Sequence, residues 1–219
     1  ISAGSNINIS GNSIANSGTS ISPESSSLVL RNNIFNSNYY GIKFGQPTGP
    51  DTGAGINNTL IENNTLLFQI VGIQLEYDSK NNLFLNNNFT SNSKGIIDTS
   101  SSINRLIYNN SFGQINWTLT NISFNDNLSI GTNLFLENNK IGLADLATLS
   151  NLNTSTKIEI KSLSYSTMPK LLKNGIRCDL SDVCNTTYSS NILYADITSF
   201  SNYTTQENLT YITNCSSIT

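Results

Sequence analysis

The sequence predicts an all-β protein that begins as a coil of short parallel strands. A pattern between residues 58 and 120 repeats about every 23 residues, a length typical of stacked repeat architectures. Each pass has two adjacent asparagines, an apolar residue three positions before the second one, and further apolar residues two and nine positions after it. The asparagine pairs are Asn63-Asn64, Asn86-Asn87 and Asn109-Asn110.

Equivalent residues of successive passes are expected to stack in columns, because neighbouring strands lie about 4.8 Å apart. The three apolar columns are Ile61, Phe84 and Ile107; Leu66, Phe89 and Phe112; and Ile73, Ile96 and Leu119. The second asparagines, Asn64, Asn87 and Asn110, are expected to form a ladder of side-chain hydrogen bonds at one corner. Gly72 and Gly95, just before the third column, are expected to supply positive φ where the coil turns.

Less regular passes flank this pattern. Two fit residues 1–44, with Leu30 and Asn33 in the positions of Ile61 and Asn64. A last pass is expected at residues 136–142, followed by a short helical or irregular cap with leucines at helical spacing. Insertions interrupt the period at residues 45–56 and 121–132. An insertion of this kind is either a binding loop or a tolerated surface loop, and both interpretations stay open.

From residue 154 the pattern changes to the alternation of antiparallel strands, with a hairpin turn at Asn174-Gly175. The sequence therefore predicts two domains, a coil at 1–153 and a small immunoglobulin-like β-sandwich at 154–219. Cys178 and Cys184 are expected to form a disulfide in an oxidising compartment. A metal site is the alternative, but the chain has no His and no CxxC pair, and no cofactor is expected. Cys215 is left without an assigned partner.

Composition limits the function classes. Charged residues make up 11% of the chain and the net charge is −3, so no basic surface is available to recruit nucleic acid. No apolar run reaches the ~18 residues of a membrane-spanning helix. The sequence starts without an initiator Met or a signal peptide, which suggests a processed chain or a part of a longer one.

Asn-x-Ser/Thr sequences are frequent, and such a site on a secreted protein's surface accepts N-linked glycan. An Asn/Ser/Thr-rich chain also makes these sequences by chance, so occupancy stays open. Surface position favours Asn57, Asn121, Asn127, Asn202 and Asn208. The further candidates are Asn185, Asn153, Asn116 and Asn88.

The first two thirds of the chain resembles the right-handed parallel β-helix repeat family, carried by NNLFLNNNFTSNSKGIIDTSS and the neighbouring passes. That family includes pectate-lyase-like enzymes, NosD-like periplasmic proteins and many surface proteins. The tail, with KIEIKSLSY and NGIRCDLSDVC, resembles the small β-domain that follows such repeats in large archaeal cell-surface proteins. Together the resemblances imply an extracellular, glycosylated, multidomain protein.

The sequence contains few residue patterns that are typical of a catalytic site. The repeat register brings only Glu76, Asp78 and Asp98 near one another, as a candidate acid–base group of a lyase or hydrolase. The alternative is that Glu76 and Asp78 are solvated turn residues. A sugar-stacking strip is one interpretation of five aromatic residues, and mixed core and turn positions is the other. The five are Tyr39, Tyr40, Tyr77, Tyr108 and Trp117.

These observations favour a non-catalytic structural or adhesive glycoprotein of the cell surface, a rod in a layer, stalk or filament that associates with itself or other surface proteins. The alternative is a polysaccharide-binding or polysaccharide-degrading β-helix protein. A NosD-like role in maturing a metalloenzyme is a third hypothesis, disfavoured by the missing His and Met-rich motifs.

Overall fold

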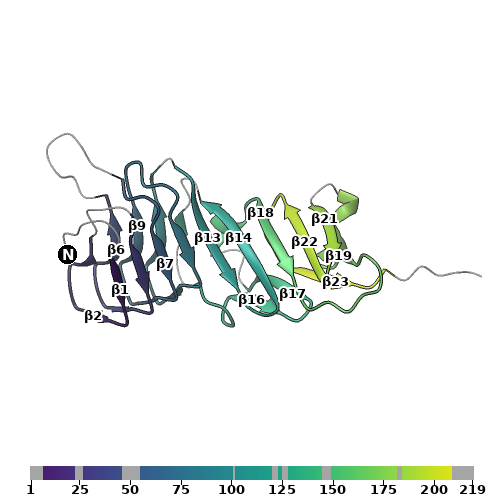
Figure 1. Ribbon diagram of the computed structural model, residues 1–219, viewed down its shortest axis with the longest axis horizontal. Helices are drawn as coiled ribbons and strands as arrows, with labels where there is room; N and C mark the ends of the chain where they lie inside the picture. Colours follow the sequence, from purple (N-terminus) through teal and green to yellow (C-terminus); the bar gives the residue numbers. More distant parts are fainter. Residues whose placement is uncertain are drawn as a thin grey trace, which may run out of the picture.

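The computed structural model describes residues 7–22, 27–45, 55–100, 102–119, 123–124, 128–144, 149–181 and 184–208. Figure 1 shows an elongated molecule in which strands succeed one another along the long axis. Apart from two short 3-10 helices, the regular elements of the described residues are all strands. The predicted all-β class is therefore confirmed.

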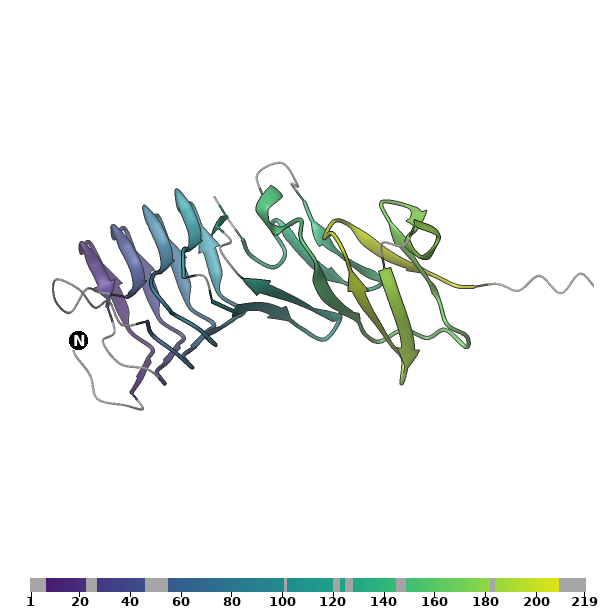
Figure 2. The ribbon, with the colours of Figure 1, turned by 90° about the horizontal axis from the view of Figure 1, so that it is seen from above.

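Three parallel sheets make up the first half, and each takes one strand from each of four successive passes; the first sheet takes a further strand from a fifth pass. The first contains β1 (Asn8–Ser10), β4 (Val29–Arg31), β7 (Leu60–Glu62), β10 (Leu83–Leu85) and β13 (Asn104–Asn109). The second contains β2 (Ser13–Ala15), β5 (Ile34–Asn36), β8 (Thr65–Leu67) and β11 (Asn88–Thr90). The third contains β3 (Thr19–Ile21), β6 (Tyr40–Phe44), β9 (Val71–Leu75) and β12 (Lys94–Asp98). Figure 2 shows these purple-to-blue strands as a regular stack, which we call the parallel stack.

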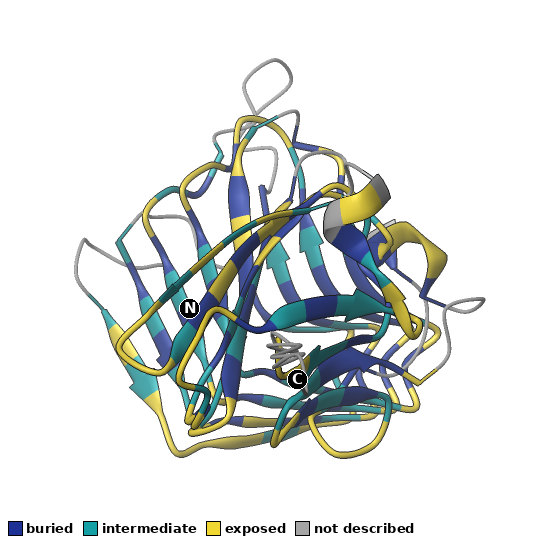
Figure 3. Ribbon diagram, turned by 90° about the vertical axis from the view of Figure 1, so that its right-hand side faces the viewer, coloured by how far each residue is buried: buried dark blue, intermediate teal, exposed yellow. Residues whose placement is uncertain are grey.

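The predicted apolar columns are confirmed for the first two of the three regular passes between residues 58 and 120. Leu30, Ile61 and Phe84 lie in register on β4, β7 and β10, and each is fully buried. Figure 3, viewed along the long axis, shows buried segments around the interior. Burying such side chains contributes roughly 2 kcal/mol each, so the columns supply much of the stack's stability.

The corners of the stack hold buried polar ladders. Asn64 Oδ1 accepts hydrogen bonds from the backbone N and Nδ2 of Asn33, both at 3.0 Å. Asn87 Oδ1 accepts the same pair from Asn64 at 3.0 Å, and Asn64 Nδ2 also donates to the Leu30 carbonyl at 2.8 Å. The predicted ladder is confirmed at Asn64 and Asn87.

The sequence analysis missed two further ladders, because their members differ in residue type. Side-chain acceptors at the second corner are Asn38, Gln69 and Asn92, and those at the third are Thr59, Asn82 and Asn104. All six are buried. Every corner of the stack therefore satisfies its backbone N–H groups through side chains of the next pass.

The role predicted for the glycines is wrong. Positive φ falls on corner residues such as Asn63 (53°) and Asn86 (51°), whereas Gly72 and Gly95 have no such φ. A Cβ on Gly72 would lie 2.5 Å from the carbonyl oxygen of Gly95. Glycine is needed there because successive passes approach too closely for a side chain.

The third of the regular passes is also predicted wrongly, beginning with the register of its first strand. Phe84 pairs with Leu106, and Ile107 pairs with Leu85, so Ile107 leaves the predicted column. The offset arises because Asn104 follows Asn82 after 22 residues, where the earlier corner spacing is 23. Leu106 is buried in its place.

Asn110 closes a hairpin and does not extend the ladder. Its Oδ1 accepts from the backbone N of Phe112 (2.9 Å) and Gly113 (3.1 Å), and β14 (Gly113–Leu119) runs antiparallel to β13. Phe112, predicted to be buried, is 40% exposed, while Leu119 is buried on β14. Tyr108 donates its hydroxyl to the Asn87 carbonyl at 2.6 Å, which caps the Asn ladder.

The last predicted pass is an antiparallel hairpin as well, formed by β16 (Leu134–Glu137) and β17 (Lys140–Leu143). Asn139, with φ of 60°, lies in its turn. The expected cap contains a 3-10 helix, η1 (Ser150–Leu152), with Leu149 and Leu152 buried, and residues 145–148 lie outside the described residues. β15 (Ser123–Phe124) pairs antiparallel with β12 and so forms the edge strand of the third sheet.

The remaining strands form what we call the antiparallel end. The first sheet continues through β14, β18 (Thr156–Ile160), β22 (Ile192–Ile197) and β21 (Cys184–Ser189), giving nine strands. The other sheet has the order β16, β17, β23 (Tyr203–Gln206), β19 (Lys170–Lys173) and β20 (Ile176–Arg177). Asn174 and Gly175, both with positive φ, make the predicted turn between β19 and β20.

The core of the antiparallel end is aromatic. Phe200 packs edge-on against Trp117, with ring centroids 4.9 Å apart, and against Tyr203. All three are fully buried. Because β14 and β18 are neighbours in one sheet, a sheet crosses the predicted boundary at residue 153. The division into 1–153 and 154–219 stays a prediction.

Candidate functional site

The three candidate carboxylates lie in different environments. Asp98 pairs with Leu75 as predicted, but its side chain is 2% exposed. Its Oδ1 accepts from Ser100 N (2.9 Å) and Oγ (2.6 Å), and its Oδ2 accepts from Asn104 Nδ2 (3.3 Å). Asp98 therefore terminates the third-corner ladder in the interior, where substrate has no access.

Glu76 and Asp78 lie at the surface. Glu76 forms an ion pair with Lys43 at 3.7 Å and accepts a hydrogen bond from Gln74, and Asp78 is exposed. With Asp98 enclosed and Glu76 paired with Lys43, the three candidate carboxylates do not come together as one accessible acid–base group. Within the described ranges, no three His, Cys, Asp or Glu side chains are grouped as metal ligands.

The predicted disulfide is present. Cys178, in η2 (Cys178–Ser181), is bonded to Cys184 at the start of β21, with 5.7 Å between the Cα atoms. The bridge ties the 3-10 helix to the edge strand of the nine-stranded sheet. Cys215 lies outside the described residues.

The glycan acceptor candidates differ in accessibility. Asn153, Asn185 and Asn208 are exposed, and Asn57, Asn88, Asn116 and Asn202 are half-buried. The Oδ1 atom of Asn202 is buried, has no hydrogen-bond partner among the described residues, and lies where a Cβ on Gly142 would be. Asn202 is therefore a poor acceptor. Asn121 and Asn127 lie outside the described residues.

The aromatic residues do not form one surface strip. Tyr108 and Trp117 are buried, whereas Tyr39 and Tyr77 are 50% and 42% exposed. The ring of half-buried Tyr40 lies 5.1 Å from Lys43 Nζ. Mixed core and surface positions, the second interpretation, describe this set.

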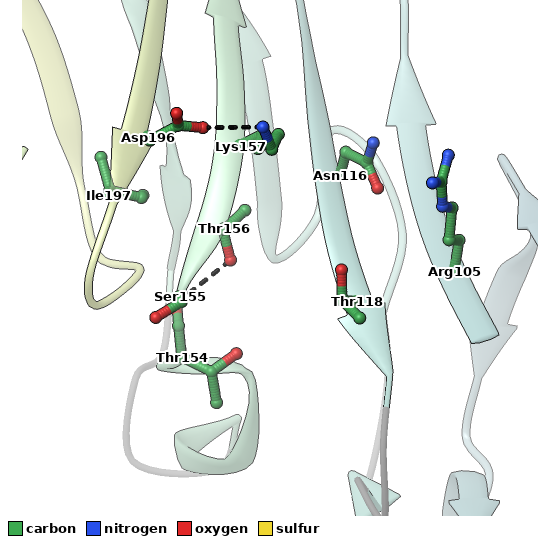
Figure 4. Close-up of a pocket in the computed structure, with 9 residues that line it drawn as sticks. All are labelled: Arg105, Asn116, Thr118, Thr154, Ser155, Thr156, Lys157, Asp196 and Ile197. Carbon is green, nitrogen blue, oxygen red and sulfur yellow. Dashed lines mark hydrogen bonds and ion pairs between the residues drawn. The ribbon is translucent and has the colours of Figure 1, made fainter. Parts of the chain in front are cut away.

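A polar groove lies on the outward face of the nine-stranded sheet, and we call it the outer groove. It has a volume of about 640 Å³ and is lined by Arg105, Asn116, Thr118, Ser155, Lys157 and Asp196, among others. Figure 4 shows side chains of β13 and β14 on one side and of β18 and β22 on the other. The same face continues over Gln114, Thr187 and Tyr194 as a second hollow of about 250 Å³.

Sheet register sets the order of these side chains. Ile107, Asn116, Lys157 and Asp196 lie opposite one another on successive strands. Outward positions alternate with buried ones such as Leu106, Trp117 and Ile158, as a strand with one face on the core requires. The side chains that line the groove are therefore polar and held in position by the sheet, whose other face packs on the aromatic core.

Charges on this face are mostly paired. Lys157 Nζ lies 3.3 Å from Asp196 Oδ1, and Lys161 Nζ lies 3.5 Å from Glu159 Oε2. Arg105 forms no ion pair or hydrogen bond through its side chain with the described residues. Its cross-strand neighbours, Leu83 and Thr118, carry no charge. An unpaired guanidinium therefore projects at one side of the groove.

The sequence analysis did not identify the outer groove. Asn116 was predicted only as a glycan acceptor. The available signal was the alternation of polar residues in β14 and β18. Their convergence needed the successive antiparallel pairing of β13, β14, β18 and β22.

Comparison with known proteins gives one positive result. Residues 1–142 match the family model described as periplasmic copper-binding protein (NosD). This match covers the parallel stack and its first antiparallel strands. Neither the curated proteins nor the solved structures include one that matches the chain.

Proposed function

Because the chain belongs to the family described as periplasmic copper-binding protein (NosD), we propose that it acts outside the cytoplasm as a non-catalytic structural module. The three parallel sheets would form a closed right-handed solenoid, a rigid rod within a surface layer, stalk or filament. The rod would associate with further copies or with other surface proteins.

One observation carries this proposal. The three corner ladders and the apolar columns continue from pass to pass through the parallel stack, as far as the pass that contains Asn87. A stack in which each pass contacts only its neighbours adds stability along one axis and gives a stiff, extended shape. Such a shape suits a spacer or scaffold.

Copper does not fit the residues of this chain. Copper sites in proteins are built from imidazole, thiolate and thioether ligands, and the chain has no His and one Met, Met168. Of its three cysteines, Cys178 and Cys184 are oxidised to a disulfide. The proposed role therefore uses the repeat architecture of the family without the metal in its description.

The enzymatic alternative receives no support from Asp98, which is enclosed among Ser100 and Asn104. None of the helices in the described residues is both long and apolar enough to cross a membrane. The proposed placement outside the cytoplasm agrees with the disulfide. The exposed acceptors Asn153, Asn185 and Asn208 support the glycoprotein part of the proposal.

Electron microscopy of native material from the cell envelope tests the proposal. We expect fibres, stalks or a layer in which the rod is a repeating component. Glycopeptide mass spectrometry of the same material is expected to find glycan at Asn153, Asn185 and Asn208, and none at Asn202. Dispersed single particles in the soluble extracytoplasmic fraction, with all these sites unmodified, would contradict the structural role.

A further inference from the structure

We infer that two copies of this chain dimerise end to end through the first pass of the parallel stack, with their edge strands antiparallel across a two-fold axis. The surface that pairs is formed by β1, β2 and β3, each an edge strand of its sheet among the described residues, and we call it the first-pass end. Figure 2 shows these purple strands at one tip of the molecule. The inference rests on the self-association in the proposed function and adds the surface and the partner.

The first-pass end exposes backbone donors that every later pass uses. In each sheet, an N–H at the start of a later strand donates to a carbonyl of the preceding pass. For the second pass these bonds are Val29 N to Ile7 O (2.9 Å), Ile34 N to Asn12 O (2.8 Å) and Tyr40 N to Gly18 O (2.9 Å). By register, the equivalent donors of the first pass are the N–H groups of Asn8, Ser13 and Thr19, and no described strand lies beyond them to accept.

The apolar columns are also unfinished at this end. Ile9 and Ile14 are half-buried, whereas the next residues in their columns, Leu30 and Phe35, are fully buried. Removing apolar surface from water favours association. A partner that covers the first-pass end would therefore complete both columns as well as the backbone hydrogen bonds.

The first pass has no charge that would keep a second copy away. Residues 7–22 contain no Asp, Glu, Lys, Arg or Pro, whereas each later pass of the stack has at least one charged residue. Soluble proteins usually protect an edge strand with Lys, Pro or a bulge, because an unprotected edge pairs with another strand. Two first-pass ends can therefore meet without repulsion between like charges.

The far end of the stack does not offer a matching surface. There β13 pairs with β14 and β12 pairs with β15, while Phe89 of β11 exchanges backbone hydrogen bonds with Leu128 at 3.1 and 3.0 Å. All three of these partners are antiparallel. Head-to-tail growth is therefore blocked, and antiparallel pairing is how the chain already closes the other end of the same three sheets.

Two first-pass ends match each other in strand length and direction. Across a two-fold axis through Ile9, β1 would run antiparallel to β1 of the second copy, and β2 of each copy would meet β3 of the other. Each of these strands has three residues, so none overhangs. The other edge strands of the described chain, β16, β20 and β21, would each cover only one strand of the three. The dimer would be closed, a rod of twice the length with an antiparallel end at each tip.

The test is light scattering of the purified whole chain over an about hundredfold range of concentration, because dimerisation follows mass action. We expect the mass to rise to that of two chains and no further. Amide hydrogen exchange, followed by NMR at low and high concentration, locates the interface. Exchange should slow with concentration at Asn8, Ser13 and Thr19, and should stay unchanged along β21.

Asn8→Lys combined with Ser13→Lys tests the surface. Both side chains are exposed, and their cross-strand neighbours Val29 and Ile34 are uncharged, so the single chain should still fold. The added charges on two edge strands should weaken dimerisation by about tenfold or more. Urea denaturation of each variant checks that the stack remains folded.

Val29→Lys combined with Ile34→Lys is the matched control, because it adds the same charge in the same two columns one pass further from the joint. It should weaken dimerisation by less than about threefold, since salt screens charges beyond a Debye length of about 8 Å.

Four results would overturn the inference: a monomer at every concentration, masses beyond a dimer, equal weakening by both pairs of substitutions, or protection in β21 instead of the first pass. The structural role is judged separately. A monomeric purified chain that nevertheless occurs in fibres or layers of the envelope would keep that role and remove the dimer. Two-chain particles confined to the soluble fraction would keep the dimer and remove the role.

Discussion

The parallel stack and the antiparallel end satisfy their buried polar groups in different ways. Strands in the stack are mostly three residues long, and most of them are followed by a corner residue with positive φ. Strands in the antiparallel end reach six or seven residues, with tight hairpin turns. The stack therefore has many more corners per residue, and each corner exposes backbone groups that a ladder residue must satisfy.

Because of this difference, the residues whose replacement should cost the most stability belong to different chemical classes in the two regions. In the stack, fully buried asparagines such as Asn64 and Asn87 hold the passes together. In the antiparallel end, buried aromatic rings pack on one another, with Phe200 in contact with both Trp117 and Tyr203. A buried amide without its partners loses hydrogen bonds that it cannot replace in the interior, whereas truncating an aromatic ring removes buried apolar area and leaves a cavity.

Breaking the ladder in its middle should have the largest effect. Asn64→Leu conserves side-chain volume but leaves Asn33 N and Nδ2 without an acceptor and removes the donor to Leu30. Unsatisfied buried groups cost roughly 1–3 kcal/mol each, so we expect the free energy of unfolding to fall by about 4 kcal/mol. Urea denaturation measures the change. Asn12→Leu, at the exposed end of the same ladder, should cost less than about 1 kcal/mol, and equal losses at both positions would disprove the ladder's role.

Alkaline pH should lower the free energy of unfolding through two buried tyrosines, one in each region. Burial raises the pKa of Tyr203 to about 12 and raises the pKa of Tyr108 as well, while tyrosines of the unfolded chain titrate near 10. Above pH 10 the unfolded state releases protons that the folded state keeps, so stability is full below pH 10 and falls as pH rises toward 12. Each tyrosine should contribute a loss of about 1.4 kcal/mol per pH unit in that window.

Denaturation curves from pH 9 to 12 measure this loss. Tyr203→Phe should flatten the curve by the contribution of the antiparallel end, and Tyr108→Phe by that of the stack. Tyr39→Phe serves as control, because Tyr39 is 50% exposed and its replacement should leave the slope unchanged. Identical slopes for all three variants and the parent chain would show that neither buried hydroxyl is linked to unfolding.

Removing the disulfide should have a smaller effect, confined to the antiparallel end. The Cys178–Cys184 bridge closes a loop with a sequence separation of 6, and a loop this short is expected to contribute roughly 2 kcal/mol. In the double Cys178→Ser and Cys184→Ser variant, hydrogen exchange should accelerate in β21 but not in β7 to β11. Cys215→Ser keeps the Cys178–Cys184 bridge, so it should behave as the parent. Faster exchange throughout the double variant would mean that the two regions unfold together.

The sequence analysis succeeded where one pass repeats the next. The columns at Leu30, Ile61 and Phe84 and the ladder at Asn64 and Asn87 were predicted because identical spacing implies identical geometry. It failed at Asn110, where the same Asn-Asn pattern closes a hairpin through the backbone N–H groups of Phe112 and Gly113. An asparagine supports a corner and a turn equally well, so the local sequence did not distinguish them.

The outer groove was beyond prediction for a related reason. Arg105 and Asp196 are far apart in the chain, and nothing near either residue specifies its neighbours across the sheet. The alternation in β14 indicated which side chains face outward, but not which strands would lie beside it. Antiparallel pairing of β14 with β13 and β18 supplied that information.

By itself, the sequence determined the all-β class, the stacking of equivalent side chains and the Cys178–Cys184 bridge, because each depends on short-range spacing. Tertiary structure alone decided where the parallel passes end, which charges are paired and which polar side chains share one face. These properties depend on contacts between distant segments, and their free energies are set by burial and partner geometry that no local pattern contains.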